Sequence, residues 1–172
     1  KKGFDMIGVD ASAEMLSVAT EKCAASGKNI LLLNQSMENL DLYGTVNAVF
    51  CSLDGINHLL TKTSLEKAFS NVGLFLEKGG VFVFDLITLN RFVRLNGEAC
   101  IRDEEKVFCS YRYFFEEAKP MLYIDLDLFS QTGKTWYRET EQICERPWSI
   151  EDIDLALETA GLQRTEITSD FS

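Results

Sequence analysis

Short apolar runs that do not alternate with polar residues recur along the first half of the chain. They lie at residues 4–10, 30–34, 48–51 and 81–87. Strands covered by helices on both faces have this pattern, because neither face needs to be polar. Helical patterns between these runs give the order strand, helix, strand, strand, helix, strand. The first half therefore predicts an α/β fold with a doubly wound, mostly parallel sheet.

Two helices are predicted in this half from their start and stop signals. Ser12 is a suitable N-cap for the first helix, and Gly27 is expected to end it. The second helix follows a capping-box pattern at residues 63–66, and its apolar residues recur at helical spacing. We expect Lys78-Gly79-Gly80 to end it with a left-handed cap.

After about residue 96 the pattern changes to long, aromatic and partly alternating runs. These runs cover residues 107–115, 121–129 and 134–145, with turn-forming residues between them. This is typical of an antiparallel β meander inserted into the α/β domain. A last helix is predicted after Ser149, followed by a strand over residues 162–168. We thus assign residues 1–95 and 147–172 to the α/β domain and residues 96–146 to the insert.

The composition indicates which kinds of partner and which cellular compartment to expect. The 172 residues include 17 Lys and Arg against 27 Asp and Glu, a net charge of −10, with no long basic run. Nucleic acid is therefore not expected as a partner. The apolar runs are too short to span a membrane. Five scattered cysteines without paired spacing indicate reduced thiols in a cytoplasmic protein, and neither a disulfide framework nor a metal site is expected.

The polar residues that follow the strands are the first candidates for a site. Ligands of a doubly wound sheet lie over the carboxyl ends of its strands. This rule brings Asp10, residues 35–37, residues 51–57 and Asp85 toward one rim. A carboxylate at a strand end can accept hydrogen bonds from both hydroxyls of a ribose. The alternative for Asp10 is an acid that only caps the following helix.

Four segments resemble, in order and spacing, motifs of the class I S-adenosylmethionine-dependent methyltransferases. They are Val9–Ala19, Gln35–Leu40, Ala48–Leu59 and Phe75–Asp85. Later segments at 137–141, 146–148 and 160–162 resemble a small-molecule subgroup that carries a β insert before its last helix. The resemblance covers most of the chain and implies a Rossmann-like methyltransferase fold with S-adenosylmethionine as cofactor.

The resemblance also implies roles for individual residues. Asp10 would bind the ribose hydroxyls, Met15 would pack near the adenosine, and the backbone around Met37 would meet the adenine edge. Ser36 stands where the family commonly has Asp, so its hydrogen bond to adenine would lack charge assistance. The backbone at 51–53 would line the methionine part, while the Cys51 thiol itself is more typical of a buried apolar residue. The implied cofactor-binding residues are Asp10, Ala11, Met15, Ser36, Met37, Glu38, Cys51, Ser52 and Leu53.

The insert would lie above the same rim as an acceptor-side lid. We accordingly predict that Asn57, Tyr137, Arg138 and Arg146 contact the methyl acceptor. The alternating charges of the last long strand are also typical of a solvated face. His58, the sole histidine, is either a base or a solvated capping side chain, and we assign no catalytic residue.

Two departures from the family concern its first strand with the glycine-rich loop, and its final strand. The loop would precede Phe4, and no G-x-G occurs in the 172 residues. The final strand would follow Ser172. We therefore expect the fold to be truncated at both ends in this chain, with the missing segments present in the natural protein.

The leading functional hypothesis is transfer of the sulfonium methyl of S-adenosylmethionine to a small-molecule acceptor by in-line displacement. A nicotinamide-dependent oxidoreductase is one alternative, because an acid at a strand end serves that cofactor equally well. A methyltransferase-like binding protein without turnover is the other. Exposed edges of the meander suggest pairing between two copies, so a homodimer is an open expectation.

Overall fold

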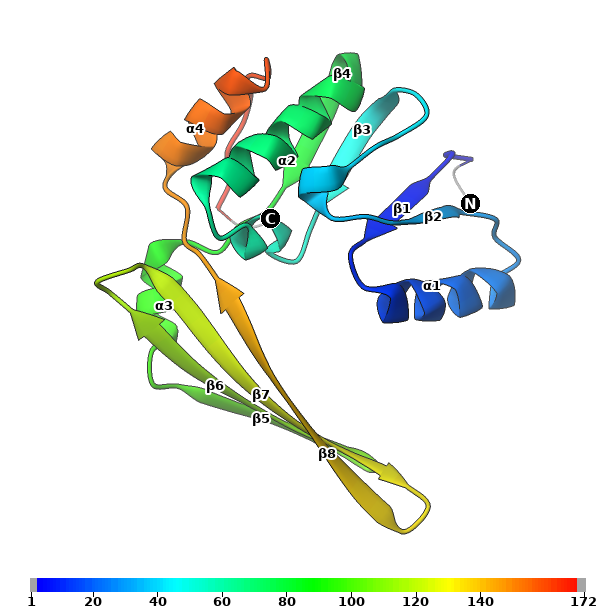
Figure 1. Ribbon diagram of the computed structural model, residues 1–172, viewed down its shortest axis with the longest axis vertical. Coiled ribbons are helices and arrows are strands. Elements are labelled where there is room, and N and C mark those ends of the chain that lie inside the picture. Colours follow the sequence, from blue (N-terminus) through cyan, green and yellow to red (C-terminus); the bar gives the residue numbers. More distant parts are fainter. Residues whose placement is uncertain (1–2, 170–172) are drawn as a thin grey trace.

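Two parallel strand pairs, each built around a helix, form the first half of the computed structural model, which describes residues 3–169 (Figure 1). The two residues before this range and the three after it belong to the predicted α/β domain but lie outside the described residues. β1 pairs with β2, and β3 with β4. The elements are β1 (Ile7–Asp10), α1 (Ala13–Ala25), β2 (Leu31–Asn34), β3 (Val46–Cys51), α2 (Lys62–Phe75) and β4 (Leu76–Phe84). The predicted order of strands and helices is confirmed.

The two pairs do not join into one sheet within the described residues. The edge of β1 that faces away from β2, and the edge of β3 that faces away from β4, have no strand partner there. Open strand edges of this kind can pair with a further strand. The α/β class is confirmed, but the continuous sheet is not observed here.

Helix boundaries follow the capping chemistry, with one correction. Ser12 caps α1 as predicted, since its hydroxyl accepts from the Met15 N–H at 3.1 Å. The N-cap of α2 is Thr61 rather than Thr63, because the Thr61 hydroxyl accepts from the Ser64 N–H at 3.0 Å.

The predicted end of α2 was also wrong. The helix ends at Phe75, and Lys78, Gly79 and Gly80 lie within β4. Gly79 has φ 83°, and the register between β3 and β4 shifts near this point. The glycines therefore serve a strand irregularity instead of a helix cap.

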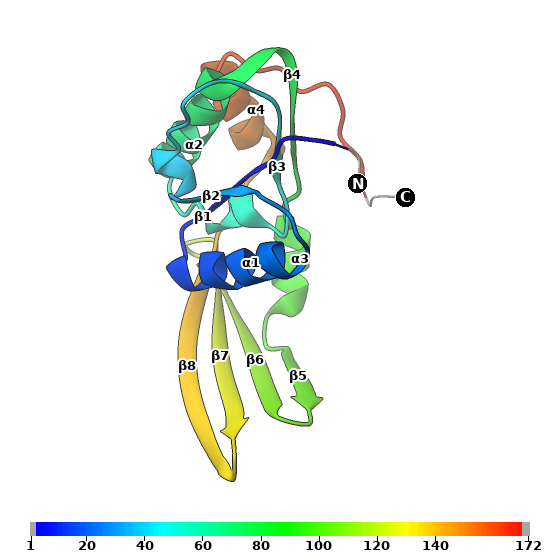
Figure 2. The same cartoon turned by 90° about the vertical axis from the view of Figure 1, so that its right-hand side faces the viewer.

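Four antiparallel strands in the order β5-β6-β7-β8 form the meander. They are β5 (Ala99–Glu104), β6 (Val107–Glu116), β7 (Met121–Thr132) and β8 (Thr135–Glu145). The sequence predicted the last three, but missed β5 and the helix α3 (Leu89–Leu95) before it. Figures 1 and 2 both show the meander projecting away from the α/β part as a twisted ribbon.

The structure has two hydrophobic cores, one in the α/β part and one between α3 and the meander. The larger core joins α2, α4 (Ile150–Thr159) and the short 3-10 helix η2 (Gly55–His58). At its centre Phe69 is fully buried, and its ring meets those of Phe82 and Phe84 edge-on with centroids 5.4 Å apart in each case. The smaller core packs Phe92 of α3 against Phe115 and Leu122 of the meander.

The segment after α4 differs from expectation. Gly161 takes a left-handed conformation with φ 72°, as a residue ending a helix does. The strand predicted over residues 162–168 is not formed. A strand needs a neighbour to accept its backbone hydrogen bonds, and this segment has none among the described residues.

Within the described residues, no helix combines the length and the apolarity that crossing a bilayer requires.

Candidate functional site

Asp10 ends β1 with an exposed side chain, and only one of its carboxylate oxygens is engaged. Oδ1 accepts from the Ser12 N–H at 2.8 Å and so fixes the turn into α1. Oδ2 has no hydrogen bond to the described residues. The two interpretations of Asp10 are thus compatible, because one oxygen orders the turn while the other can receive a hydroxyl.

Asn34 at the end of β2 holds this turn from the neighbouring strand. Its Nδ2 donates to the carbonyls of Asp10 at 3.0 Å and Ala11 at 2.9 Å. Asn34 is not among the residues predicted to form the site. An asparagine directly after an apolar run was the available signal, since its amide can satisfy carbonyls that the sheet leaves open.

The segment after β2 continues the rim as the 3-10 helix η1 (Met37–Asn39). The Ser36 hydroxyl accepts from Nδ2 of Asn39 at 2.9 Å. The Met37 carbonyl accepts from Asn71 of α2 at 3.1 Å. These bonds fix the backbone that the family resemblance predicts to lie beside adenine. Glu38 and Met37 are both half-buried.

The loop after β3 is conformationally strained. Leu53 and Asp54 have φ of 59° and 53°, a left-handed region that residues other than glycine rarely occupy. The Leu53 side chain is 83% exposed. The Asp54 N–H donates to Oδ1 of Asp85 at 3.3 Å, which ties the loop to the end of β4. Strain of this kind gathers at ligand-binding segments.

The Cys51 thiol is half-buried at the end of β3. Burial, followed by the charges of Asp85 and Asp54, raises its pKa to about 11. Its Sγ lies 3.7 Å from the Met37 sulfur. A Cβ at Gly55 would lie 2.7 Å from this Sγ, so a larger residue there would displace the thiol. The predicted apolar role of the thiol fits this geometry.

Asn57 is fully buried and joins both chain connections between the α/β part and the meander. Its Nδ2 donates to the carbonyls of Ile87 at 3.0 Å and Arg146 at 2.8 Å, while its Oδ1 accepts from the Ile87 N–H at 2.8 Å. The Arg146 N–H also donates to the Asn57 carbonyl at 2.8 Å. This burial argues against the direct acceptor contact that the sequence predicts for Asn57, and indicates a clamp.

The other predicted acceptor residues are divided between two places. Arg146 lies beside η2, where its Nη1 donates to the Leu60 carbonyl at 3.0 Å and its guanidinium stacks 4.3 Å from the Trp148 ring centre. Tyr137 and Arg138 lie near the β7–β8 turn, at the far end of the meander (Figure 1). Arg138 pairs there with Asp127 at 2.6 Å. The structure does not bring these two residues to the rim.

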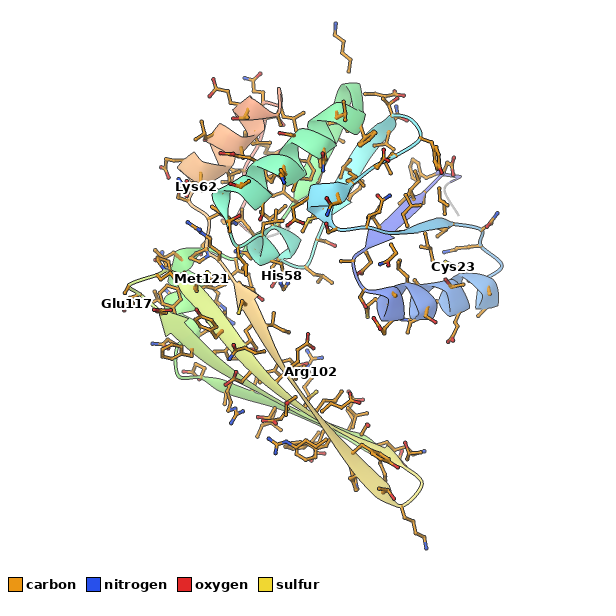
Figure 3. All side chains as sticks on the ribbon, viewed as in Figure 1. Cys23, His58, Lys62, Arg102, Glu117 and Met121 are labelled. Atoms are coloured by element: carbon orange, nitrogen blue, oxygen red, sulfur yellow. The ribbon has the colours of Figure 1, made fainter. Side chains whose placement is uncertain are left out.

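His58 ends η2 and is exposed to solvent. Figure 3 shows it at the edge of the α/β part that faces the meander. No hydrogen bond engages its side chain among the described residues. Met15 is 58% exposed in the first turn of α1, and Ser52 is exposed after β3. The residues predicted to bind the cofactor thus lie at or just after the carboxyl ends of β1, β2 and β3.

A family profile described as "Methyltransferase domain" matches residues 1–80. YqeM of Bacillus subtilis strain 168, a protein provisionally named as a methyltransferase, is 28% identical over 174 aligned residues. That alignment covers 100% of this chain and 70% of YqeM.

Two solved structures share the fold. A crystal structure of an S-adenosylmethionine-dependent methyltransferase from Clostridium acetobutylicum superposes with a TM-score of 0.82 at 28% identity, over 91% of this chain and 63% of that one. The sugar N-methyltransferase KedS8 from Streptoalloteichus superposes with a TM-score of 0.78 at 21% identity, over 91% and 62%. The chain therefore spans somewhat under two thirds of the solved structures it matches.

Proposed function

We propose that this chain belongs to the class I S-adenosylmethionine-dependent methyltransferase family, binds that cofactor at the carboxyl ends of β1, β2 and β3, and serves methyl transfer to a small-molecule acceptor. The observation that carries the proposal is the half-engaged carboxylate of Asp10 at the end of β1. One oxygen is held by the Ser12 N–H, so the side chain is oriented before any ligand arrives.

The residues present fit the nucleoside part of this cofactor. A ribose diol needs an acceptor at a strand end, and Oδ2 of Asp10 supplies one. The adenine needs a fixed backbone edge, and Asn71 holds the Met37 carbonyl so that the segment keeps its shape. In addition, the exposed loop at 52–53 offers backbone carbonyls to a positively charged ligand group.

The bound cofactor supplies an electrophilic methyl group on a positively charged sulfur. The residues of this chain then have to bind, orient and exclude water rather than activate a nucleophile. Alignment of reacting groups alone contributes on the order of 7–11 kcal/mol. A reaction of this kind does not require a dedicated general base.

The acceptor would approach from the side where the meander joins the α/β part. Asn57 and Arg146 fix this junction and act as positioning residues, because their polar atoms are already bonded to backbone carbonyls. KedS8, whose fold is similar, is named a sugar N-methyltransferase. By analogy, we propose a small polar acceptor bearing an amine or a hydroxyl.

The nicotinamide alternative is less well supported than methyl transfer. The matching family profile describes a methyltransferase domain. The similar crystal structure from Clostridium acetobutylicum is that of an S-adenosylmethionine-dependent methyltransferase.

A calorimetric titration of the intact protein with S-adenosylhomocysteine tests the proposal. Asp10→Asn keeps an oxygen for the Ser12 N–H but removes the charge. It should therefore weaken binding by about 1.5–3 kcal/mol, which is roughly 10- to 100-fold. Asp5→Asn is the matched control, since Asp5 is exposed just before β1 and should leave the affinity unchanged. Equal affinities for Asp10→Asn and the wild-type protein would remove Asp10 from the site.

We also propose that two copies of the protein pair through the edges of the meander. The edge strands β5 and β8 of the meander are exposed along most of their length. Strand edges of this kind can pair with a second copy, and sedimentation of the intact protein measures whether they do.

A further inference from the structure

Three side chains from distant parts of the sequence meet where the meander joins the α/β part. Asp54 precedes η2, His58 ends η2, and Glu145 is the last residue of β8. Each offers one ligand atom, and these atoms all lie within 4.8 Å of one another. We call Asp54, His58 and Glu145 the junction cluster. Figure 3 shows His58 at this position.

Glu145 is the unusual member of the junction cluster. Glu145 is only 4% exposed to solvent. Its Oε2 atom is buried and has no hydrogen-bond partner among the described residues. Most buried polar atoms in folded proteins are satisfied. A buried carboxylate oxygen without a partner needs either a proton or a cation.

Among residues 3–169, no lysine or arginine supplies that cation, because the ion pairs found there involve neither Asp54 nor Glu145. The carboxylates of the junction cluster therefore have no lysine or arginine partner in that part of the chain, and a bound cation would supply the missing positive charge.

We propose that the junction cluster binds a divalent first-row transition-metal ion of the Mn²⁺ to Zn²⁺ series. Two carboxylate oxygens and one imidazole nitrogen suit these ions, whereas Mg²⁺ and Ca²⁺ prefer oxygen ligands alone. Donor atoms of a tetrahedral site stand roughly 3.5 Å apart, so the cluster needs only a small contraction to close on an ion. Three protein ligands leave at least one position open, and the exposed His58 gives access from solvent.

The junction cluster shares no residue with the proposed cofactor contacts, although Asp54 directly follows Leu53. The sequence predicts no metal, because two of the ligands lie in one loop and the third lies far along the chain on another strand. No spacing of cysteines or histidines in the sequence indicates such a site.

Electron paramagnetic resonance of Mn²⁺ tests the proposal on the intact protein. Bound Mn²⁺ loses the sharp signal of the free ion, and Mn²⁺ binds thiols weakly, so the five cysteines do not interfere. We expect one Mn²⁺ per chain, displaced by Zn²⁺. Glu145→Gln and His58→Ala should each weaken Mn²⁺ binding tenfold or more. Glu141→Gln, an exposed carboxylate on the same strand, is the control and should change it less than twofold.

Each of the following results would overturn the metal proposal. A dissociation constant for Mn²⁺ above about 1 mM, or unchanged binding in Glu145→Gln, overturns the proposal. If only Mg²⁺ binds and His58→Ala leaves its affinity unchanged, the site is an oxygen site without the imidazole, which also overturns it. Circular dichroism verifies that each variant is folded. Cofactor binding by the same samples reports on the proposed function independently of the metal.

Discussion

Replacement of Asn57 by alanine should uncouple the meander from the α/β part. The substitution leaves three backbone groups without their side-chain partner: the N–H and carbonyl of Ile87, and the carbonyl of Arg146. Each buried group left unsatisfied costs about 1–3 kcal/mol. Water entering the vacated space recovers part of this cost. We therefore expect the free energy of unfolding to fall by about 3 kcal/mol.

Urea denaturation of the intact protein measures this loss, and Asn47→Ala is the matched control. Asn47 is exposed, and its side chain makes one hydrogen bond, to Glu77. Its replacement should cost less than about 1 kcal/mol, as is usual for exposed positions. Hydrogen exchange adds a local test, because the Arg146 N–H donates to the Asn57 carbonyl and should lose protection in Asn57→Ala. A loss below about 1 kcal/mol for Asn57→Ala would show that the clamp does not join the two parts.

Two further results are expected. In metal-free protein, the carboxyl of Glu145 has its pKa raised from 4.5 to about 7 by burial and by Asp54. Stability should therefore fall as the pH rises from about 4.5 to 7, since the unfolded chain loses this proton first. The loss is at most about 3 kcal/mol. Denaturation of Glu145→Gln at pH 5 and pH 8 should show a smaller fall than wild type; an identical fall would contradict the assignment. Alkylation followed by mass spectrometry should modify the exposed Cys100 well before Cys51, whose thiol stays protonated, and the reverse order would refute the buried role.

The sequence predicted the order of the α/β elements because that information is local. Runs without alternation and the caps Ser12 and Ser149 depend on neighbouring residues only, and both serines accept the expected backbone N–H. The helix boundaries were harder to predict, because more than one nearby residue could cap the helix. Thr61 and Thr63 both lie near the start of α2, and the structure places Thr61 at the N-cap and Thr63 within the helix. β5 was missed because it is short, charged and exposed on both faces.

Site residues that directly follow a strand could be predicted from the sequence. Roles that depend on contact between distant segments could not. Asp10 was found by its position after an apolar run. The clamp role of Asn57 depends on the approach of Ile87 and Arg146, which no local pattern reveals. Arg138 was expected at the rim, but its salt bridge with Asp127 lies along the meander, and the length of β8 carries it away from η2.

The most direct test of the central claim is a crystal structure of the intact protein grown with S-adenosylhomocysteine. The account predicts ribose hydroxyls within hydrogen-bond distance of the Asp10 carboxylate, and adenine beside the Met37 backbone. A nucleoside bound elsewhere on the protein, with Asp10 contacting only Ser12, would contradict it.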